Sequence, residues 1–154
     1  ERAVSDAIEE NGGRPSIAMA PLLRRYAAAR PVDPLPHKLL ADLALSGVEG
    51  MSATEAIEHL EYLDAREQYT AVYALELSRQ YAAAGDMTKA AEKAERATRV
   101  APYDARTREH AATIALRMKD YATAERHLSA LAALEPDREI HQKRLEALER
   151  LRAG

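Results

Sequence analysis

The sequence predicts an all-α protein built of antiparallel helix pairs, and three observations support this prediction. The stretch from 71 to 136 carries one pattern of small and apolar residues twice, in two consecutive copies of equal length. No segment is convincing as a β-strand. The 154 residues include many alanines but no Phe and no Trp. A core rich in alanine requires helices that approach closely, which favours helix-on-helix packing over a β-sandwich.

The repeated pattern is defined by residues at matched positions of two copies. The first copy consists of Leu77, Ser78, Tyr81, Gly85, Asp86, Ala90, Ala94, Ala97 and Pro102. The second consists of Ala111, Ala112, Ala115, Lys119, Asp120, Ala124, Leu128, Leu131 and Pro136. This pattern resembles the tetratricopeptide repeat (TPR) family, whose unit of about 34 residues follows W-x2-L-G-x2-Y, then A-x3-F, then P.

The resemblance implies an architecture for the whole chain. It covers about 39–136 and, more loosely, the chain from Leu22 onward. It implies a right-handed superhelical solenoid of antiparallel helix pairs, with about 3.5–4 TPR-like repeats and a C-terminal capping helix. We therefore expect a single TPR-like domain over 1–154. Its expected parts are a degenerate repeat at 3–36, repeats at 37–70, 71–104 and 105–138, and a capping helix at 139–152.

The N-terminal segment is expected to hold two short helices. The first, over 1–10, ends at Asn11-Gly12-Gly13 by C-cap chemistry. The apolar face expected for it consists of Ala3, Val4, Ala7 and Ile8. The second helix is expected from about 20 to 29. Its expected buried face consists of Leu22, Leu23, Tyr26 and Ala29.

Two features connect this segment to the next repeat. Three prolines, Pro31, Pro34 and Pro36, are expected to form a rigid connection that is not helical throughout. The repeat period also pairs positions of the second helix with positions one repeat later. The expected pairs are Leu22 with Ala56, Tyr26 with Leu60, Ala29 with Leu63, and Pro34 with Gln68.

The repeat at 37–70 contains clear signals for the end of one helix and the start of the next. The segment 46–50 ends the first helix, whose expected apolar residues are Leu39, Leu40, Leu43 and Ala44. Ser52 and Glu55 form a capping box, in which each side chain accepts a hydrogen bond from the other's amide. A second helix with Ala56, Ile57, Leu60 and Leu63 follows. One continuous helix over 52–84 is the alternative, because no Pro or Gly interrupts it, although the apolar stripe lapses across 64–68.

The repeat at 71–104 matches the family pattern best. Gly85 suits the left-handed position that follows a helix, and Asp86 can cap the next helix. The row Ala90, Ala94, Ala97 lies on one helix face, with Tyr81 expected to fill the space beside it. In the following repeat Asp120 caps the second helix without a glycine-containing turn.

The last helix, over 139–152, is expected to close the array. One face is apolar, with Leu145, Leu148 and Leu151 along its inner edge. The pairs Glu139–Lys143 and Glu146–Arg150 lie on the outer side at i,i+4 spacing. A helix with one apolar and one charged face is what the end of a solenoid requires.

Composition and motifs exclude several functional classes. The net charge of −3 argues against a dedicated nucleic-acid binder. The absence of cysteine removes disulfides and thiolate metal sites. No apolar run reaches the roughly 18 residues of a membrane helix. The chain begins with Glu1 rather than Met, so we expect a fragment whose N-terminus is missing, and its localisation stays open.

No catalytic or metal-binding constellation is present, so we expect a non-enzyme without cofactor or metal. There is no H-E-x-x-H, no G-x-S-x-G and no phosphate loop after a strand. Glu55, Glu58 and His59 lie on neighbouring helical turns, where a solvated helix face is the simpler interpretation than a metal site.

Binding is the better candidate function. In the family that the chain resembles, the first helix of each repeat lines a concave groove where partner peptides lie. The lining residues implied here are Lys38, Asp42, Leu45, Val72, Leu75, Glu76, Arg79, Arg106, Glu109, His110 and Thr113. The alternative for each is a solvated face with no partner.

One known use of the family is a clamp for the C-terminal carboxylate of chaperones, built from Lys and Asn. This chain has Ala41 and Leu45 at the places of the first Lys–Asn pair and Glu76 at that of the next Asn. Only Arg106 is compatible with the clamp. The sequence therefore rejects this particular use.

The leading hypothesis is a protein–protein interaction module that binds a peptide or protein surface in the groove, with no nucleic acid and no membrane insertion. The second is a non-catalytic C-terminal scaffold or dimerisation domain of a larger bacterial protein. The V-D-P-L-P-H segment at 32–37 weakly resembles repeats that follow peptidase-like domains. A homodimer therefore stays open, and RNA binding is disfavoured because no basic face is evident.

Overall fold

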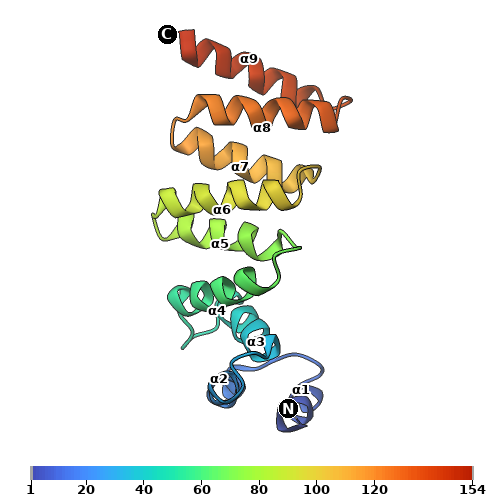
Figure 1. Cartoon of the computed structure of the whole chain (residues 1–154), viewed down its shortest axis with the longest axis vertical. Helices are drawn as coiled ribbons and strands as arrows, with labels where there is room; N and C mark the ends of the chain where they lie inside the picture. Colours follow the sequence, from blue (N-terminus) through green and yellow to red (C-terminus); the bar gives the residue numbers. More distant parts are fainter. Residues whose placement is uncertain (1, 154) are drawn as a thin grey trace. The chain divides into compact units, whose positions relative to one another are not determined.

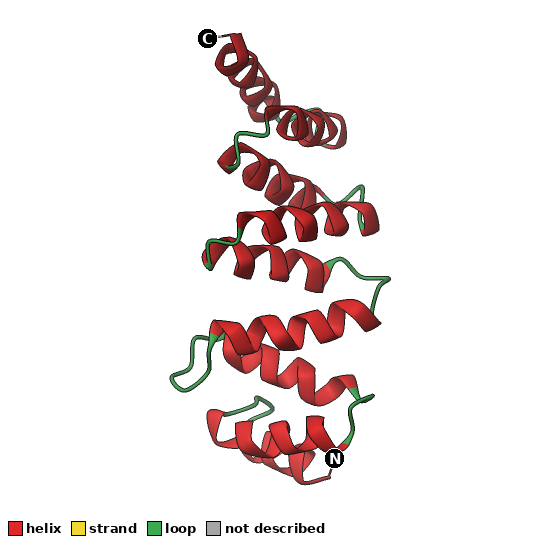
Figure 2. Ribbon diagram, turned by 60° about the vertical axis from the view of Figure 1, so that its left-hand side comes forward, coloured by secondary structure: helices red, strands yellow, loops and turns green. Residues whose placement is uncertain are grey.

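The computed structural model describes residues 2–153, and every regular element within that range is a helix (Figures 1 and 2). Glu1, which the sequence placed in the first helix, lies outside the described residues. The helices are α1 (Arg2–Glu10), α2 (Ala20–Ala29), α3 (Pro34–Leu45), α4 (Ala53–Arg66), α5 (Val72–Ala83), α6 (Met87–Val100), α7 (Ala105–Arg117), α8 (Tyr121–Leu134) and α9 (Glu139–Ala153). A short 3-10 turn, Ile17–Met19, precedes α2.

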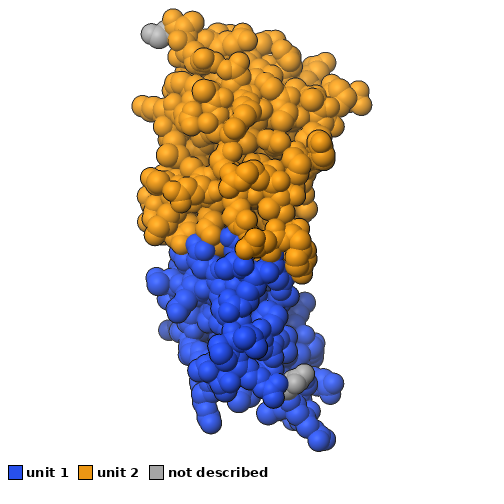
Figure 3. Space-filling view, viewed as in Figure 1, with its two compact units in different colours: residues 1–67 blue, residues 68–154 orange. Residues whose placement is uncertain are grey.

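The chain divides into two compact units, Glu1–Glu67 and Gln68–Gly154 (Figure 3). The first contains α1 to α4 and the second α5 to α9. Within the second unit, consecutive helices run antiparallel and are joined by short loops (Figures 1 and 2). The most extensive packing is between α3 and α4, α5 and α6, and α7 and α8. The prediction of an all-α protein made of helix pairs is thereby confirmed.

Two separate helices occupy the stretch for which one continuous helix was the alternative. Helix α4 ends at Arg66 and α5 begins at Val72. In the turn between them, the Thr70 hydroxyl accepts a hydrogen bond from the Val72 amide at 3.3 Å. A hydroxyl that satisfies a free amide in this way favours a new helix start over continuation of the old one.

The proline connection is shorter than expected, because Pro34 and Pro36 belong to α3. Asp33 caps this helix by accepting a hydrogen bond from the Leu35 amide at 2.9 Å. The two prolines occupy the first turn, where backbone amides have no partner within the helix, so their missing N–H groups cost nothing. Only Pro31 remains in the connection.

The N-terminal helices follow a longer spacing than the repeat period. Leu23 and Tyr26 are the buried residues of α2 that correspond to the buried Leu60 and Leu63 of α4, whereas Ala29 is exposed. The loop between α3 and α4 explains the shift, since it spans residues 46–52 while the loop between α5 and α6 spans only 84–86. The assignment of Leu22 and Ala29 to the repeat period was wrong for this reason.

Small residues hold the helices of the second unit together, as the repeated pattern predicted. Ala90, Ala94 and Ala97 are at most 2% exposed on α6. Half-buried Tyr81 packs against the cluster that contains two of these alanines. On α8 the equivalent residues are Ala124, Leu128 and Leu131, which are also buried.

The residues of α9 that are buried differ from those expected. Leu148 is buried and Leu145 is half-buried, but Leu151 is 61% exposed. His141, near the start of α9, is buried instead. The outer pairs Glu139–Lys143 and Glu146–Arg150 are present at 3.5 and 3.8 Å. Leu151 lies near the C-terminal end of α9, beyond the buried part of its apolar face.

The capping box at the start of α4 is only half formed. The Ser52 hydroxyl accepts a hydrogen bond from the Glu55 amide at 3.1 Å, as expected. The Glu55 carboxylate instead receives two hydrogen bonds from the Arg24 guanidinium, at 2.7 and 2.9 Å. Both alternatives are charge-assisted hydrogen bonds of the carboxylate, but the arginine supplies two of them where the Ser52 amide would supply one.

The turns after α5 and α7 have the same backbone geometry but different residues. Gly85 has φ of 85°, and Lys119, at the matched position of the next repeat, has φ of 59°. In both turns the following aspartate amide bonds back to a carbonyl of the helix, from Asp86 to Tyr81 and from Asp120 to Ala115, at 2.9 Å. Glycine adopts this left-handed conformation without penalty, whereas a side chain such as that of lysine is strained in it.

Substitution at these two turns should change stability in opposite directions. Lys119→Gly relieves the strain of the Cβ and should stabilise the protein by about 0.5 kcal/mol, after allowance for the extra entropy of glycine in the unfolded chain. Gly85→Ala introduces the same strain and should cost about 1 kcal/mol, although its Cβ would meet no atom within 4 Å. Urea denaturation measures the stability of both variants. A loss of stability in Lys119→Gly would contradict the assignment of a strained left-handed backbone to Lys119.

Candidate functional site

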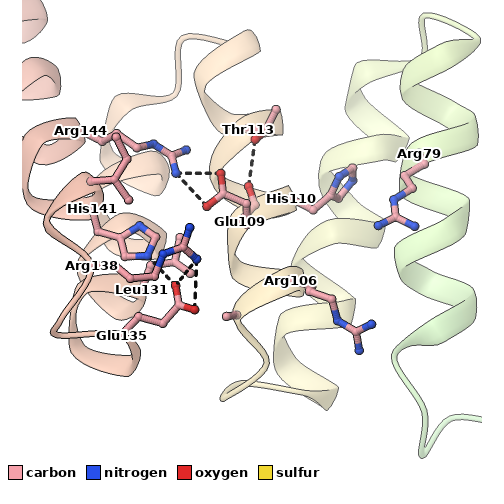
Figure 4. Close-up of a pocket in the computed structure, with 12 residues that line it drawn as sticks. Arg79, Arg106, Glu109, His110, Thr113, Leu131, Glu135, Arg138, His141 and Arg144 are labelled. Carbon is pink, nitrogen blue, oxygen red and sulfur yellow. Dashed lines mark hydrogen bonds and ion pairs between the residues drawn. The ribbon is translucent and has the colours of Figure 1, made fainter.

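The second unit contains a cavity of about 590 Å³ whose walls come from α5, α7, the end of α8 and α9 (Figure 4). The residues that line it are Arg79, Ala105, Arg106, Glu109, His110, Thr113, Leu131, Glu135, Arg138, Ile140, His141 and Arg144. Nine of these twelve residues have polar or charged side chains, and the other three, Ala105, Leu131 and Ile140, are apolar.

Five of the residues predicted to bind a partner line this cavity. They are Arg79 on α5 and Arg106, Glu109, His110 and Thr113 on α7. The three other predicted residues of α5 lie outside the lining. Val72 is 64% exposed, Leu75 is half-buried, and Glu76 accepts hydrogen bonds from Arg79 at 3.2 Å and Gln80 at 2.8 Å.

The remaining three predicted residues, Lys38, Asp42 and Leu45, lie on α3 in the other compact unit. Lys38 forms an ion pair with Glu67 at 2.6 Å. Asp42 and Leu45 are exposed. None of the three lines the cavity of the second unit.

Sequence reasoning missed Ala105 at the start of α7 and all of the lining that comes from α8, α9 and the turn between them. The missed residues of that second part are Leu131, Glu135, Arg138, Ile140, His141 and Arg144. The repeat period could have found two of them, because Ile140 and Arg144 occupy the positions one repeat after Arg106 and His110. Treating α9 only as an end cap obscured its second role as a wall of the cavity.

Both carboxylates of the cavity are held by cationic or imidazole groups. Arg144 contacts the two oxygens of Glu109 through one nitrogen at 2.7 and 2.8 Å. Glu135 lies 2.6 Å from the Nε2 atom of His141 and 3.1 Å from Arg138. The hydrogen bond with His141, assisted by the charge of Arg138, lowers the pKa of Glu135.

The two histidines of the cavity have defined hydrogen bonds. The Ser78 hydroxyl donates to the Ala90 carbonyl at 2.6 Å, so the Nε2 atom of His110, 2.7 Å away, must donate to Ser78. Within the described part of the chain, the buried Nδ1 atom of His141 has no hydrogen-bond partner. Burial lowers the pKa of His110 and favours its neutral form.

Comparison with solved structures shows what this helical array is similar to. MamA superposes with a TM-score of 0.67 at 14% identity, over 97% of this chain and 85% of that one. The type III secretion translocator chaperone SycD of Yersinia enterocolitica gives 0.64 at 18% identity, over 80% and 90%. The first TPR of Spaghetti (RPAP3), bound to an HSP90 peptide, gives 0.62 at 14% identity, over 80% and 100%. The fold is a TPR fold.

α5 and α7 carry matching positions of the two sequence copies, and so do α6 and α8. The cavity is lined by α5 and α7 together with α9, where Ile140 and Arg144 are the matching positions farther along the chain. No protein-family model and no curated protein sequence matches the chain. The similarity thus concerns three-dimensional structure at low sequence identity.

Two further features bear on the classes of function. Among the described residues, no group of three or more His, Cys, Asp or Glu side chains is arranged to hold a metal ion. Within the same range, none of the TPR helices is long and apolar enough to cross a membrane.

The lowered pKa values of the histidines predict how the free energy of unfolding depends on pH. Burial lowers the pKa of each of His37, His59, His110 and His127 below the ordinary value. The unfolded chain therefore takes up protons near pH 6.5 while the native state resists them. Urea denaturation should show a stability that is highest above pH 7 and falls as the pH decreases from 7 to 5.

A histidine variant provides the control for this prediction. His110→Gln removes one of the four groups, so its stability should fall less steeply between pH 7 and 5 than that of the wild-type protein. Stability that rises on acidification through this range would contradict the assignment of neutral, buried histidines.

Proposed function

We propose that the chain is a protein-interaction module that binds a peptide or protein surface in the groove lined by the first helices of its TPR pairs. The observation that carries this proposal is the cavity of about 590 Å³ between α5, α7 and α9. Five of the residues that the family resemblance assigned to binding lie on its walls.

The physical character of the cavity fits a peptide ligand. Cavities of about 300–1,000 Å³ accommodate small ligands, and this one has the size for a few side chains of a peptide. Its side chains come from three helices that the core holds in place, because the opposite faces of α7 and α9 pack on α8. A preformed site of this kind loses little entropy when it binds.

Similar structures provide a precedent for this mode of binding. SycD has been solved in complex with a peptide of the translocator YopD, and the first TPR of RPAP3 with an HSP90 peptide. The structure of the SycD complex superposes with a TM-score of 0.60 at 21% identity. These complexes concern those proteins, and they support the use of the same fold for peptide binding here.

The proposal is tested by selecting peptides from a random displayed library against the full chain and titrating the selected peptides by calorimetry. Arg79→Glu should change the affinity of the selected peptides at least about tenfold, because it reverses a charge on the cavity wall. The matched control is Arg150→Glu, which changes an exposed arginine on the outer face of α9 and should leave affinity within about twofold. Failure to select any peptide, or equal affinity of the two variants, would overturn the proposal.

A further inference from the structure

A separate cavity of the second unit lies between α6, α7 and α8 and has a volume of about 430 Å³. It shares no lining residue with the cavity of α5, α7 and α9. Its charged lining residues are Glu95 and Arg99 on α6, Arg108 on α7 and Arg126 on α8. Pro102, in the loop between α6 and α7, also lines it. We call these five residues the arginine pocket.

The arginine pocket contains three guanidinium groups but only one carboxylate. Arg126 contacts Glu95 through a single nitrogen at 2.8 Å, and its side chain is 59% exposed. Arg99 is exposed, and neither it nor Arg108 pairs with a carboxylate among the described residues. Even if Glu95 fully neutralises Arg126, two positive charges of the lining therefore have no counter-charge in it.

Other acidic residues on these helices are committed elsewhere or lie at a distance. The Asp104 carboxylate accepts hydrogen bonds from two amides at the start of α7, at 2.8 and 3.1 Å. Asp120 caps α8 in the same way, through one amide at 3.1 Å. Glu92 stands two turns before Arg99 on α6, a rise of about 10 Å along the helix. Within the described residues, none of these carboxylates contacts an arginine of the pocket.

A buried histidine fixes the geometry of the pocket. The side chain of His127 is completely buried, and its Nδ1 atom lies 3.2 Å from a terminal nitrogen of Arg108. Because arginine can only donate, Nδ1 must accept, and the proton of the neutral ring is on Nε2. The Nε2 atom then donates to Glu95 at 2.5 Å. Burial lowers the pKa of His127, which favours this neutral form.

The Arg108 guanidinium is half-buried and has only uncharged partners. Its Nε atom donates to the Pro102 carbonyl at 2.9 Å, and the second contact is the one with neutral His127. These two contacts use two of its five N–H groups and leave three for a ligand. Taking a cation partly out of water without a counter-charge costs solvation free energy. An anion bound in the pocket would offset this cost.

The arrangement favours a tetrahedral phosphate over a carboxylate. A carboxylate has two oxygens and is satisfied by one guanidinium fork. A phosphate monoester carries close to two negative charges and three acceptor oxygens, so it can contact guanidinium groups from three directions. The three arginines come from three different helices around one cavity, which meets this requirement.

We propose that the arginine pocket binds a phosphate monoester, carried by a small molecule or by a phosphorylated serine. Arg99, Arg108 and Arg126 contact the phosphate oxygens. His127 is a positioning residue, because it holds Arg108 and Glu95 in place and does not line the pocket. The site is separate from the groove proposed for peptides and does not depend on it.

The experiment titrates the isotope-labelled full chain by NMR at constant ionic strength. One probe is glycerol 3-phosphate, and its matched carboxylate is glycerate. The other probe is a short peptide of glycine with one phosphoserine, and its control is the same peptide with serine. Both phosphorylated probes should give saturable shifts of amides around the pocket on α6, α7 and α8. Glycerate and the serine peptide should bind at least about tenfold more weakly, since each lacks the dianionic phosphate.

Variants locate the phosphate at the pocket. Arg99→Gln and Arg108→Gln should each weaken the phosphorylated probes at least about tenfold, because each removes a charge-assisted contact. Arg150→Gln makes the same change in net charge at an exposed position of α9 and should stay within about twofold. Circular dichroism verifies the fold. Arg99→Gln keeps the test valid if Arg108→Gln is unstable, since Arg99 is exposed and makes no contact that the fold requires.

The two phosphorylated probes also distinguish the sources of the phosphate. Tighter binding of the phosphoserine peptide indicates a phosphorylated protein, and equal or tighter binding of glycerol 3-phosphate indicates a small phosphorylated molecule. The absence of saturation with both probes, or equal binding of glycerate, would overturn the proposal. An unchanged affinity of Arg99→Gln would also overturn it. Tighter binding of an oligouridine, whose phosphates are diesters, would contradict the assignment to a monoester.

Discussion

Leu128→Ala should cost about 2–5 kcal/mol of unfolding free energy. Leu128 is 1% exposed on α8 and belongs to the core cluster that joins α7, α8 and α9. Its neighbours in that cluster include Ala112, Ala115 and Ala124, whose short side chains cannot move into the space that it leaves. The loss of buried apolar surface is therefore joined by the cost of a cavity. The midpoint of urea denaturation measures the effect.

Leu151→Ala is the matched control for this prediction, because it makes the same chemical change on α9 at a position that is 61% exposed. Its effect should be within about 0.5 kcal/mol. Equal losses in the two variants would mean that Leu128 is not a core residue and would contradict the packing described for the second unit.

Ala124→Leu should destabilise the protein by about 1–3 kcal/mol. Ala124 is completely buried where α8 packs on α7, and it repeats the position of Ala90, which is also completely buried. The added atoms of leucine have no space between helices that approach on alanine, so either the helices separate or the side chain is strained. Ala90→Leu should behave similarly between α6 and its neighbours.

Ala122→Leu tests whether the effect of Ala124→Leu comes from packing. Ala122 lies on the same helix, α8, and is exposed. Leucine and alanine both favour helices, so this change should alter stability by less than about 0.5 kcal/mol. A similar denaturation midpoint for the Ala122 and Ala124 variants would refute the close approach of α7 and α8.

The sequence predicted the helix pairs of the second unit because stacking imposes the same demand in each repeat. Ala90 and Ala124 recur at one position since any larger residue there would separate the helices. The prediction of buried positions from a constant repeat period failed in the first unit, because the loop before α4 is longer there and lengthens the period. A period assumed constant cannot detect such an insertion without knowledge of which residues are buried.

The candidate site was predictable only in part. The face of α7 follows from helical geometry, so Arg106, Glu109 and His110 could be placed on one surface from their spacing alone. The contact between Arg144 and Glu109 joins residues 35 positions apart, and it depends on the packing of α9 against α8. Which acidic groups are occupied, and therefore which arginines stay open, is a property of side-chain geometry that the sequence does not carry.

Hydrogen–deuterium exchange of the full chain, with and without a peptide selected from the library, tests the central claim most directly. A bound peptide should slow exchange of amides on the helices that line the cavity, most strongly in α7 and in the first turn of α9, where opening would have to break the new contacts. Protection confined to α6 and α8, with α5, α7 and α9 unchanged, would contradict binding in the groove.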